Sequence, residues 1–342
     1  MKKEYPKFSF CMTTYKRPSL LRSTLQTILA QTITDFEIIV SDNDPERSAE
    51  PVIQQIGDSR IKYFANPENL GMIRSFNRSI ENSSGAFIAM ITDDDPVYPD
   101  MLETLSGLID QYPDHGFYLA GCNWFCTDPD LADFYNCKVG VNSCLAKRPI
   151  DEIQAYDSVS FLKNFFNFNI FPNYLWSTAV VKRDILMKMG GVPDYDTPFL
   201  GDYAYIGVAG GDSGCVTINK ALGHQTLHKQ NFGRAQNEQL VILGPRFMDY
   251  VSSKLSHLQD WKMIKKDMEH FVAVWIVRHV AFLKAYSIHK GDKENLTELK
   301  SCEKRIFALP FMRPYRAKYF LLTQFPALHD SIVKWKRKAK RK

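Results

Sequence analysis

An apolar run from Ala86 to Ile91 is followed at once by Thr92-Asp93-Asp94-Asp95. Adjacent carboxylates at the end of a buried strand repel one another strongly unless a cation lies between them. Carboxylate oxygens are the ligands that hard divalent cations prefer, and such cations are often shared with substrate phosphates. The run therefore predicts a divalent metal site suited to a diphosphate-bearing substrate. The alternative is an acidic loop in which Asp95 caps a helix near Pro99.

A second group of reactive side chains lies between Thr13 and Pro18, in the order Thr-Thr-Tyr-Lys-Arg-Pro. Hydroxyls, an aromatic ring and two cations can hold a nucleobase and a phosphate. The loop lacks the GxGxxG of dinucleotide-binding folds and the GxxxxGK[ST] of P-loops, which argues against a dehydrogenase and a kinase. Further on, Asp42 could accept a hydrogen bond from the imide N–H of a base. Its alternative role is a turn-forming aspartate.

The elements that must position these residues alternate along the first hundred residues. Short apolar runs predict strands, and apolar residues at helical spacing predict helices between them. Repeated βαβ units imply a doubly wound parallel sheet, in which ligands bind beyond the carboxyl ends of the strands. Thr13, Asp42 and Asp93 would then reach one pocket. The predicted strands are 8–13, 36–40, 61–64 and 86–91, and the predicted helices are 19–32, 48–56, 72–82 and 99–111.

The rest of the chain divides into an irregular middle and a helical end. Strands are expected at 117–125 and 174–181, with a short helix ending at Gly190-Gly191. Between the two strands, residues 127–173 are predicted to be irregular, and their aromatic cluster indicates core packing rather than a ligand site. The cluster comprises Phe161, Phe165, Phe166, Phe168 and Phe171. Helices are expected at 239–258, 261–289, 295–308 and 317–336. We therefore expect a catalytic region over 1–233 and a helical extension over 234–342.

Composition limits the class of protein. The chain has 342 residues, and its 45% hydrophobic content is ample for a globular core. The formal charge of +5 is a property of the tail, because seven Lys and Arg residues lie between Lys334 and Lys342 and leave the remainder at −2. That distribution argues against nucleic acid as a partner. Basic residues around Trp335 fit attraction to anionic lipid, and a solvated terminus is the alternative.

The N-terminus and the cysteines bear on the cellular compartment. Residues 1–6 lead directly into a strand without a signal-peptide core, so we expect an intracellular protein. The seven cysteines are scattered and odd in number, which predicts reduced thiols. Cys122, Cys126, Cys137 and Cys144 lack the paired CxxC spacing of a zinc site, which leaves zinc as a weak alternative.

The motifs, taken in order, resemble glycosyltransferase family 2, whose members have the glycosyltransferase A fold. The resemblance rests on TTYKRP, FEIIVSDN and NPENLGMIRSFNRSIENSSGAFIAMITDDDPVYPDML, then on Gly190–Pro193, Gly201–Tyr203 and 221–231. It covers about two-thirds of the chain. It implies an α/β fold, a Rossmann-like doubly wound mixed sheet, followed by the helical extension. It also implies an inverting enzyme that uses a nucleotide-sugar donor.

Site residues carry over from the resemblance to the matching positions. The metal motif of the family is usually Asp-x-Asp followed by Asp, and here Thr92 stands at its first carboxylate. That register makes Asp94 the direct ligand of Mn²⁺ or Mg²⁺, with Asp95 orienting the assembly and Asp93 near the ribose or the metal. The implied donor-binding residues are Thr13, Tyr15, Arg17, Asp42, Asn69, Gly71, Arg74, Asp93 and His228.

An acceptor hydroxyl must lose its proton as it attacks the anomeric carbon, so a carboxylate base is needed. The resemblance implies Asp202, where Gly201 replaces the first acid of the family's usual pair. Asp194 and Asp196 are the other candidates, and Asp202 as a helix N-cap is the alternative. Trp176 could stack on an acceptor sugar, or it could simply pack in the core. His228 could contact the donor phosphates or the metal, or it could be a structural histidine.

Together these features predict a metal-dependent inverting glycosyltransferase. We expect a nucleotide-sugar donor, a UDP-sugar first, and a glycan or lipid-linked acceptor for a cell-surface polysaccharide. The basic tail would hold the enzyme on the cytoplasmic face of the membrane. A non-catalytic sugar-nucleotide-binding or scaffold protein is the alternative, favoured by Thr92 and Gly201. A nucleotidyltransferase is weaker still, because the first strand does not end in a Gly-rich loop with a basic residue.

Overall fold

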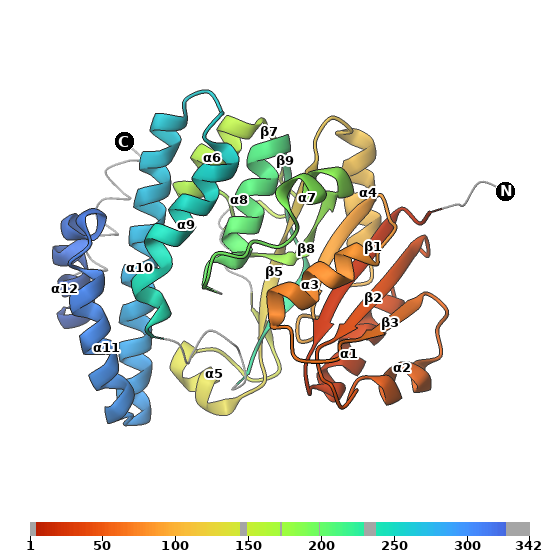
Figure 1. Ribbon diagram of the computed structural model, residues 1–342, viewed down its shortest axis with the longest axis horizontal. Helices are drawn as coiled ribbons and strands as arrows, with labels where there is room; N and C mark the ends of the chain where they lie inside the picture. The colour runs from red at the N-terminus through yellow and green to blue at the C-terminus, as the bar shows by residue number, and fades with distance from the viewer. Residues whose placement is uncertain (1–4, 144–148, 172, 198, 229–236, 326–342) are drawn as a thin grey trace.

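The computed structural model describes residues 5–143, 149–171, 173–197, 199–228 and 237–325 (Figure 1). Its first half is the predicted series of βαβ units. Strands β1, β2, β3 and β4 are parallel, and β1 lies between β2 and β4. The bounds are β1 Phe8–Thr14, β2 Phe36–Asp42, β3 Ile61–Ala65, β4 Phe87–Thr92, α1 Pro18–Leu29, α2 Glu50–Ile56 and α3 Met72–Glu81. The prediction of this half is confirmed.

Antiparallel strands make the second half of the sheet mixed. Strand β8 (Tyr174–Lys182) runs antiparallel to both β4 and β5 (Phe117–Cys126), and β9 (Cys215–Leu227) runs parallel to β5. In the described residues the sheet has nine strands in the order β3-β2-β1-β4-β8-β5-β9-β7, with β6 (Asn142–Ser143) beside β5. Helix α4 (Met101–Gln111) precedes β5.

The middle of the chain is more regular than we predicted. Residues 127–173 contain α5 (Pro129–Tyr135), β7 (Ile153–Tyr156) and α6 (Ser158–Phe166). The prediction of an irregular segment is wrong because these elements are short and nucleated by local caps. Asp128 accepts from the backbone N–H of Leu131, and Asp157 accepts from the N–H groups of Val159 and Ser160.

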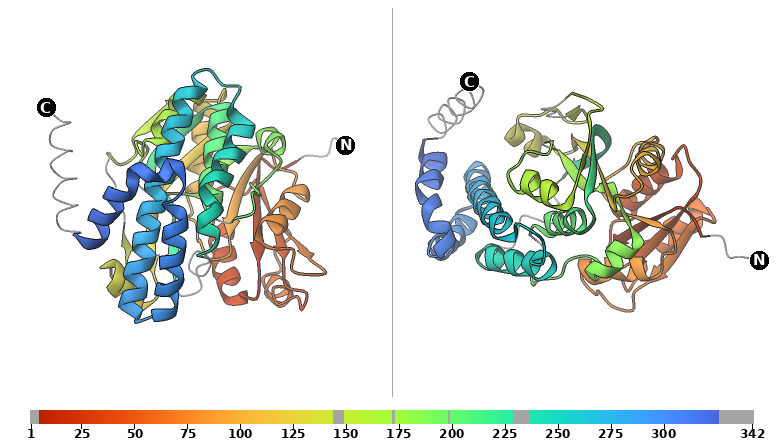
Figure 2. Two further views of the ribbon diagram at one scale, coloured as in Figure 1. Left: turned by 60° about the vertical axis from the view of Figure 1, so that its left-hand side comes forward. Right: turned by 90° about the horizontal axis from the view of Figure 1, so that it is seen from above.

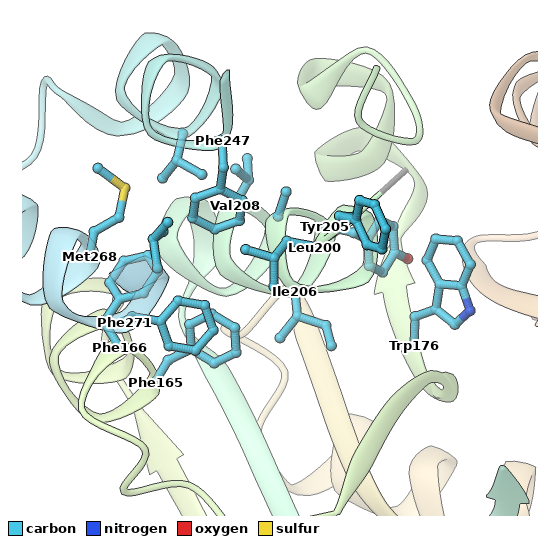
Figure 3. Packing of buried hydrophobic residues seen from close by; sticks show 14 of the residues in the cluster. Phe165, Phe166, Trp176, Leu200, Tyr205, Ile206, Val208, Phe247, Met268 and Phe271 are labelled. Atoms are coloured by element: carbon cyan, nitrogen blue, oxygen red, sulfur yellow. The ribbon is translucent and has the colours of Figure 1, made fainter. Parts of the chain in front are cut away.

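Two hydrophobic layers cover the two faces of the sheet. Along β1, Phe8, Phe10 and Met12 face a layer that includes α1 and α4, whereas Cys11 faces the layer of α3. This alternation follows from the period of two in a strand. The larger layer contains the predicted aromatic core around Phe165, and Figure 3 shows Phe165, Phe166 and Phe271 gathered together. Phe271 comes from the C-terminal helices.

The helical extension packs against this larger layer (Figure 2). It consists of α9 (Gln239–Leu255), α10 (Trp261–Lys290), α11 (Lys293–Ile306), a 3₁₀ turn (Pro310–Tyr315) and α12 (Arg316–Gln324). The predicted helices 239–258, 261–289 and 295–308 match these elements, and the part of 317–336 beyond residue 325 lies outside the described residues. The predicted boundary between the two regions is at residue 233. One hydrophobic cluster contains residues from both sides of it, so the extension and the sheet share a core.

Helix α10 is, within the described ranges, the one helix long and apolar enough to span a membrane by length and composition. Half of its most apolar window is buried inside the protein. Its buried residues include Met268, Phe271, Ile276 and Val280, which belong to the large hydrophobic cluster. It is packed as a core helix.

Strand directions bring the candidate site residues to one edge. The carboxyl ends of β1, β2, β4, β5 and β9 all point the same way. Helix α8 (Gly201–Ser213) immediately precedes β9 and returns along it, so its first turn, with Asp202, lies at the edge where β9 ends. Helix α3 follows β3 and therefore begins at the same edge. The topology thus collects residues from distant parts of the sequence.

Candidate active site

The acidic run at the end of β4 is held by hydroxyl and backbone donors. Thr14 Oγ1 donates to Asp93 Oδ2 over 2.7 Å, and Thr92 Oγ1 donates to Asp95 Oδ2 over 2.7 Å. The backbone N–H of Thr226 donates to Asp95 Oδ1 over 3.1 Å. Asp95 is therefore not a helix cap, since α4 begins at Met101 after Asp100.

Arg17 lies against two of the three carboxylates. Its Nη2 is 2.6 Å from Asp93 Oδ1, and its Nη1 is 2.9 Å from Asp94 Oδ2. Asp93 is fully buried and Asp94 is nearly so, whereas the Arg17 side chain is 29% exposed. The contact with Asp93 lacks hydrogen-bond geometry, so Oδ1 of Asp93 stays unsatisfied. One guanidinium thus faces a concentration of negative charge that it cannot fully neutralise.

His228 reaches Asp94 from the end of β9. Its Nε2 lies 3.0 Å from Asp94 Oδ2, and its side chain is 12% exposed. Strand β9 is fastened to the acidic loop by backbone hydrogen bonds from Tyr98 N to Leu222 O (2.8 Å) and from His224 N to Pro96 O (3.0 Å). Three segments that follow β1, β4 and β9 therefore meet at one point.

The three carboxyl groups differ in acidity. Burial raises the pKa of Asp93 to about 7, although the nearby Arg17 charge opposes the rise. Burial and the charge of Asp94 raise the pKa of Asp95 to about 8. Burial also acts on Asp94, but the hydrogen bond with His228 and the charge of Arg17 outweigh it and lower the pKa of Asp94. Asp94 is therefore the carboxylate most firmly ionised.

Asp42, at the end of β2, is fully buried and already bonded within the protein. Its Oδ1 accepts from Asp44 N (3.0 Å), while its Oδ2 accepts from Ala49 N (3.2 Å) and from the Tyr63 hydroxyl (2.8 Å). The bond from Asp44 is the local turn expected for the alternative role of Asp42. Contact with a base stays a prediction.

An amide network orders the loop after β3. Asn43 Nδ2 donates to Asn69 Oδ1 over 2.6 Å, and Asn69 Oδ1 also accepts from Gly71 N over 2.9 Å. Asn43 Oδ1 accepts from Leu70 N over 2.8 Å. Sequence reasoning missed Asn43, although it directly follows Asp42. The network fixes the start of α3, where Arg74 is exposed.

The hydroxyl of Thr13 is also bonded within the protein. Thr13 Oγ1 donates to Ser75 Oγ on α3, which contacts Ser41 Oγ on β2 at 2.9 Å. Tyr15, two residues after Thr13, is 42% exposed. Thr14 was missed as a site residue, although it stands beside Thr13 in the same motif.

Asp202 lies in the first turn of α8 in apolar and aromatic surroundings. Its Oδ1 accepts from the N–H of Tyr203 (2.9 Å), and the charge of Asp202 raises the pKa values of Tyr174 and Tyr195 beyond what burial does. Burial raises the pKa of Asp202 to about 6. Leu200 is the N-cap, so Asp202 is not. A carboxyl group with this pKa can accept a proton near neutral pH.

The two other acids of this region are exposed. Asp194 and Asp196 lie on the loop before α8, and Asp196 Oδ2 is 3.2 Å from Arg246 Nη2. Trp176, on β8, is 8% exposed and makes edge contacts with Phe76 (5.2 Å) and Tyr205 (6.0 Å). Figure 3 shows its indole beside Tyr205, apart from the cluster of phenylalanines. Its contacts are those of a core residue, and a role toward the acceptor stays a prediction.

The donor set at the acidic run fits a divalent cation. No group of three His, Cys, Asp or Glu side chains is arranged around a metal position in the described part of the chain. Mg²⁺ commonly takes one or two carboxylates and completes its shell with substrate phosphates and water. Asp94 and the unsatisfied Oδ1 of Asp93 supply such a pair of carboxylates. The six cysteines in the described ranges are free, and Cys144 lies outside them.

Comparison with known proteins identifies a family in the first part of the chain. Residues 9–130 match the family described as Glycosyl transferase family 2. The GalNAc(5)-diNAcBac-PP-undecaprenol beta-1,3-glucosyltransferase of Campylobacter jejuni is 35% identical over 103 residues, which cover 29% of this chain and 33% of that protein. The chain thus spans about a third of the length of that curated relative.

Solved structures show the same fold over most of the chain. S. aureus TarS 1–349 in complex with UDP-GlcNAc has a TM-score of 0.59 at 14% identity, covering 89% of this chain and 82% of that one. The mannosyltransferase PcManGT of Pyrobaculum calidifontis, in complex with GDP-Man and Mn²⁺, has a TM-score of 0.50 at 15% identity, covering 95% and 88%. The expected fold class is confirmed.

Proposed function

Since the chain belongs to glycosyl transferase family 2 through residues 9–130, we propose that it is an inverting glycosyltransferase that uses a nucleotide-sugar donor. One observation carries the proposal. The carboxylates of Asp93 and Asp94, the guanidinium of Arg17 and the imidazole of His228 converge at one edge of the sheet. Such a mixed cluster can exchange its internal ion pairs for a cation and a diphosphate.

The donor lies, in this proposal, along the edge formed by β1, β2 and β4. Tyr15 and Arg74 are exposed there and can approach a nucleotide, and the loop of Asn69 and Gly71 forms the adjoining wall. A UDP-sugar is the donor we favour, because the similarly folded TarS binds UDP-GlcNAc. The full set is Thr13, Tyr15, Arg17, Asp42, Asn69, Gly71, Arg74, Asp93 and His228.

A divalent cation, Mn²⁺ or Mg²⁺, belongs to the proposed site. Asp94 would hold it directly, because Asp94 has the lowest pKa of the three acids, and Asp95 would keep the loop in place through its bond to Thr226. When bound, the cation neutralises the charge that develops on the departing diphosphate. PcManGT, which shares the fold, was solved with Mn²⁺.

Asp202 is the proposed general base. Inversion requires that the acceptor hydroxyl attack from the face opposite the diphosphate, and its proton must pass to a group there. Asp202 stands at the same edge of the sheet on a different element, α8, and its raised pKa suits proton uptake at neutral pH. Asp194 and Asp196 are less suited because both are exposed to solvent.

The acceptor proposed is a glycan or a lipid-linked glycan in the synthesis of a cell-surface polysaccharide. The relative from Campylobacter jejuni carries an undecaprenol-linked acceptor in its name. An enzyme with such an acceptor works at a membrane surface, and the basic run from Lys334 to Lys342 would attract anionic lipid on the cytoplasmic face. Trp176, which is 8% exposed on β8, would offer its indole to an acceptor sugar.

Release of UDP tests the function. The full chain is incubated with UDP-sugars, Mn²⁺ and an undecaprenyl-diphosphate-linked glycan, and nucleoside diphosphate is measured. Turnover that is lost with a chelator and with Asp94→Ala would support the metal-dependent transferase. Turnover unaffected by either change would contradict the metal role. Donor binding by calorimetry without product from any acceptor would favour the non-catalytic alternative. Thr92 and Gly201, which stand where the family usually has acids, are the residues that favour it in the sequence.

A further inference from the structure

A polar pocket of about 320 Å³ lies in the helical extension, away from the carboxylates of the candidate active site. It is formed where α9 begins, α10 ends and α11 begins. Its lining includes Asn237, Tyr286, Lys290, Glu294, Asn295 and Glu298. In Figure 1 the ends of α10 and α11 nearest this pocket lie beside α5, which directly follows β5. The residues that line the pocket therefore lie on the side of the molecule where the strands end.

Asn237 gives the pocket an unused hydrogen-bond acceptor. The residue is 2% exposed, and its Nδ2 donates to Asn295 Oδ1 (2.5 Å) and Glu298 Oε2 (3.1 Å). Its Oδ1 is buried without a hydrogen-bond partner. A buried carbonyl oxygen left unpaired is costly, and native structures usually satisfy such groups with a partner, a water or a ligand. The missing partner must be a donor.

Charge restricts the class of ligand. Glu294 and Glu298 make the lining acidic, while Lys290 is already paired with Asp130 of α5 over 2.7 Å. Phosphates and other anions are therefore disfavoured. No group of three metal-ligating side chains occurs here, or anywhere else in the described ranges. Amide and carboxylate acceptors without a free cation suit a neutral ligand rich in hydroxyl donors, which is the chemistry of a sugar.

A row of aromatic rings connects this pocket with the catalytic edge. The ring of Tyr286 is stacked on that of Phe282, with 6.2 Å between the ring centroids and 8° between the planes. The ring centroids of Phe282 and His279 are 6.2 Å apart, and those of His279 and Phe199 are 5.3 Å apart. Phe199 is three residues before Asp202. From His279 to Tyr286 the helix rises about 10 Å. Tyr286, Phe282 and His279 are partly exposed, whereas Phe199 is buried. The C–H faces of sugar rings stack well on aromatic surfaces.

We propose that this pocket binds a neutral sugar residue of the acceptor glycan, at a distance from the hydroxyl that reacts. The inference rests on the proposed transferase function and names an extended acceptor site for it. Asn237 accepts from a sugar hydroxyl, Glu294 accepts from another, and Tyr286 supplies the apolar surface. The acceptor chain then follows the partly exposed rings of Tyr286, Phe282 and His279 toward the edge where Asp202 lies. Selection of longer glycans over short ones is the consequence.

Saturation-transfer NMR on the full chain tests the pocket without donor or metal. The probes are cellotetraose, chitotetraose and maltotetraose. We expect saturation transfer to the ring protons of at least one probe, and UDP should not displace it. Tyr286→Ala and Glu294→Ala should weaken binding at least fivefold. Ile288→Ala is the matched control, because Ile288 is 62% exposed on the same helix and does not line the pocket.

Several results would overturn the proposal. The first is the absence of saturation transfer to all three probes, and the second is displacement of a bound probe by UDP. The others are unchanged affinity in both Tyr286→Ala and Glu294→Ala, and a loss of affinity in Ile288→Ala as large as theirs. Glu294 is exposed, so its replacement keeps the test valid if Tyr286→Ala does not fold. Because no turnover is needed, an enzyme that binds a tetrasaccharide but releases no UDP would contradict the transferase function and leave the sugar site standing.

Discussion

Nε2 of His228 lies 3.0 Å from Oδ2 of Asp94, although 134 residues separate the two along the chain. The contact exists because β9 and β4 both end at the same edge of the sheet, and the hydrogen bonds of Tyr98 and His224 hold β9 beside the acidic loop. His228 thereby lowers the pKa of Asp94, together with Arg17. The most ionised carboxylate of the run is thus the one that contacts both Arg17 and His228.

Replacing His228 by Ala should weaken binding of UDP with Mn²⁺. The variant loses a contact to Asp94 and one nitrogen that can reach the metal or the phosphates, so we expect at least a tenfold loss of affinity, or about 1.4 kcal/mol. Isothermal titration calorimetry measures this directly. His257→Ala is the control, because His257 is exposed in the turn between α9 and α10, outside the candidate site. Equal affinities in wild type and His228→Ala would show that the histidine is only structural.

Replacing Arg17 by Met should destabilise the protein in the absence of metal. Asp93 and Asp94 would lose their nearest positive charge, and an uncompensated buried charge is costly. Because Arg17 is 29% exposed, solvent screens part of this loss, and we expect about 2 kcal/mol at pH 7. Urea unfolding gives the value.

Mn²⁺ should then stabilise Arg17→Met more than it stabilises the wild type, because the ion no longer competes with the guanidinium. The difference is read from thermal midpoints with and without Mn²⁺. Arg22→Met serves as the control, since Arg22 is a partly exposed arginine on α1 whose hydrogen bond goes to Gln55 rather than to the acidic run. If Mn²⁺ raised all three midpoints equally, the exchange of Arg17 for a cation would be refuted.

Local patterns were enough to predict the first half of the fold. Strands β1 to β4 are short and apolar, and the helices between them carry apolar residues at helical spacing, so each element is specified within its own segment. The same holds for α9, α10 and α11. Strand β9 escaped prediction because Lys220, His224 and Gln225 interrupt its apolar pattern. Its place in the sheet depends on β5 and β7, which lie far away in sequence.

The candidate site was predictable in its residue types but not in its internal bonding. The acidic run and the TTYKRP motif identified Asp94 and Arg17 from the sequence, and the resemblance identified His228. That Arg17 pairs with Asp93 and Asp94 depends on the geometry of two loops, which no spacing reveals. Thr226 was missed for the same reason, because its backbone N–H, not its side chain, bonds Asp95.

Gly191→Ala should lower stability markedly. Gly191 has φ of 83°, and a Cβ there would overlap Oδ1 of Asn77, which accepts from the N–H of Val192 at 2.7 Å. Backbone strain and loss of this bond together should cost about 3 kcal/mol. Gly140→Ala is the control, because Gly140 has φ of 71° but no atom lies within 4 Å of the position its new methyl group would take. Urea unfolding compares the two, and equal losses would mean that backbone strain alone acts at Gly191.

Removing residues 335–342 should release the protein from anionic vesicles. The deletion takes away six of the seven basic residues between Lys334 and Lys342, each worth about 1 kcal/mol near such a surface. Co-sedimentation with vesicles of phosphatidylserine and phosphatidylcholine at physiological salt provides the measurement, and vesicles of phosphatidylcholine alone are the control. Undiminished sedimentation of the shortened chain would assign membrane binding to another surface.

Asp202→Asn should abolish most turnover while leaving donor binding intact. A general base contributes roughly 10²- to 10⁴-fold to a rate, so kcat should fall by that factor. In the wild type, kcat/KM should rise with pH and level off above about pH 6, where Asp202 becomes a carboxylate. The exposed Asp194 provides the control, and Asp194→Asn should retain turnover. Loss of turnover in Asp194→Asn alone would move the role of base to Asp194.

The same variant should change how stability depends on pH. The pKa of Asp202 is raised from 3.8 in the unfolded chain to about 6 in the fold, so between these values the native state binds more protons than the unfolded state. The cost of ionising Asp202 is therefore absent below about pH 4, grows as pH rises, and is complete above about pH 6. Asparagine has no such cost. Asp202→Asn should thus be more stable than wild type at pH 8, by up to about 3 kcal/mol, and equally stable at pH 4. Urea unfolding at pH 4 and pH 8 measures this difference in stability. A difference that did not depend on pH would mean that Asp202 is in contact with water, and not in the apolar surroundings that raise its pKa.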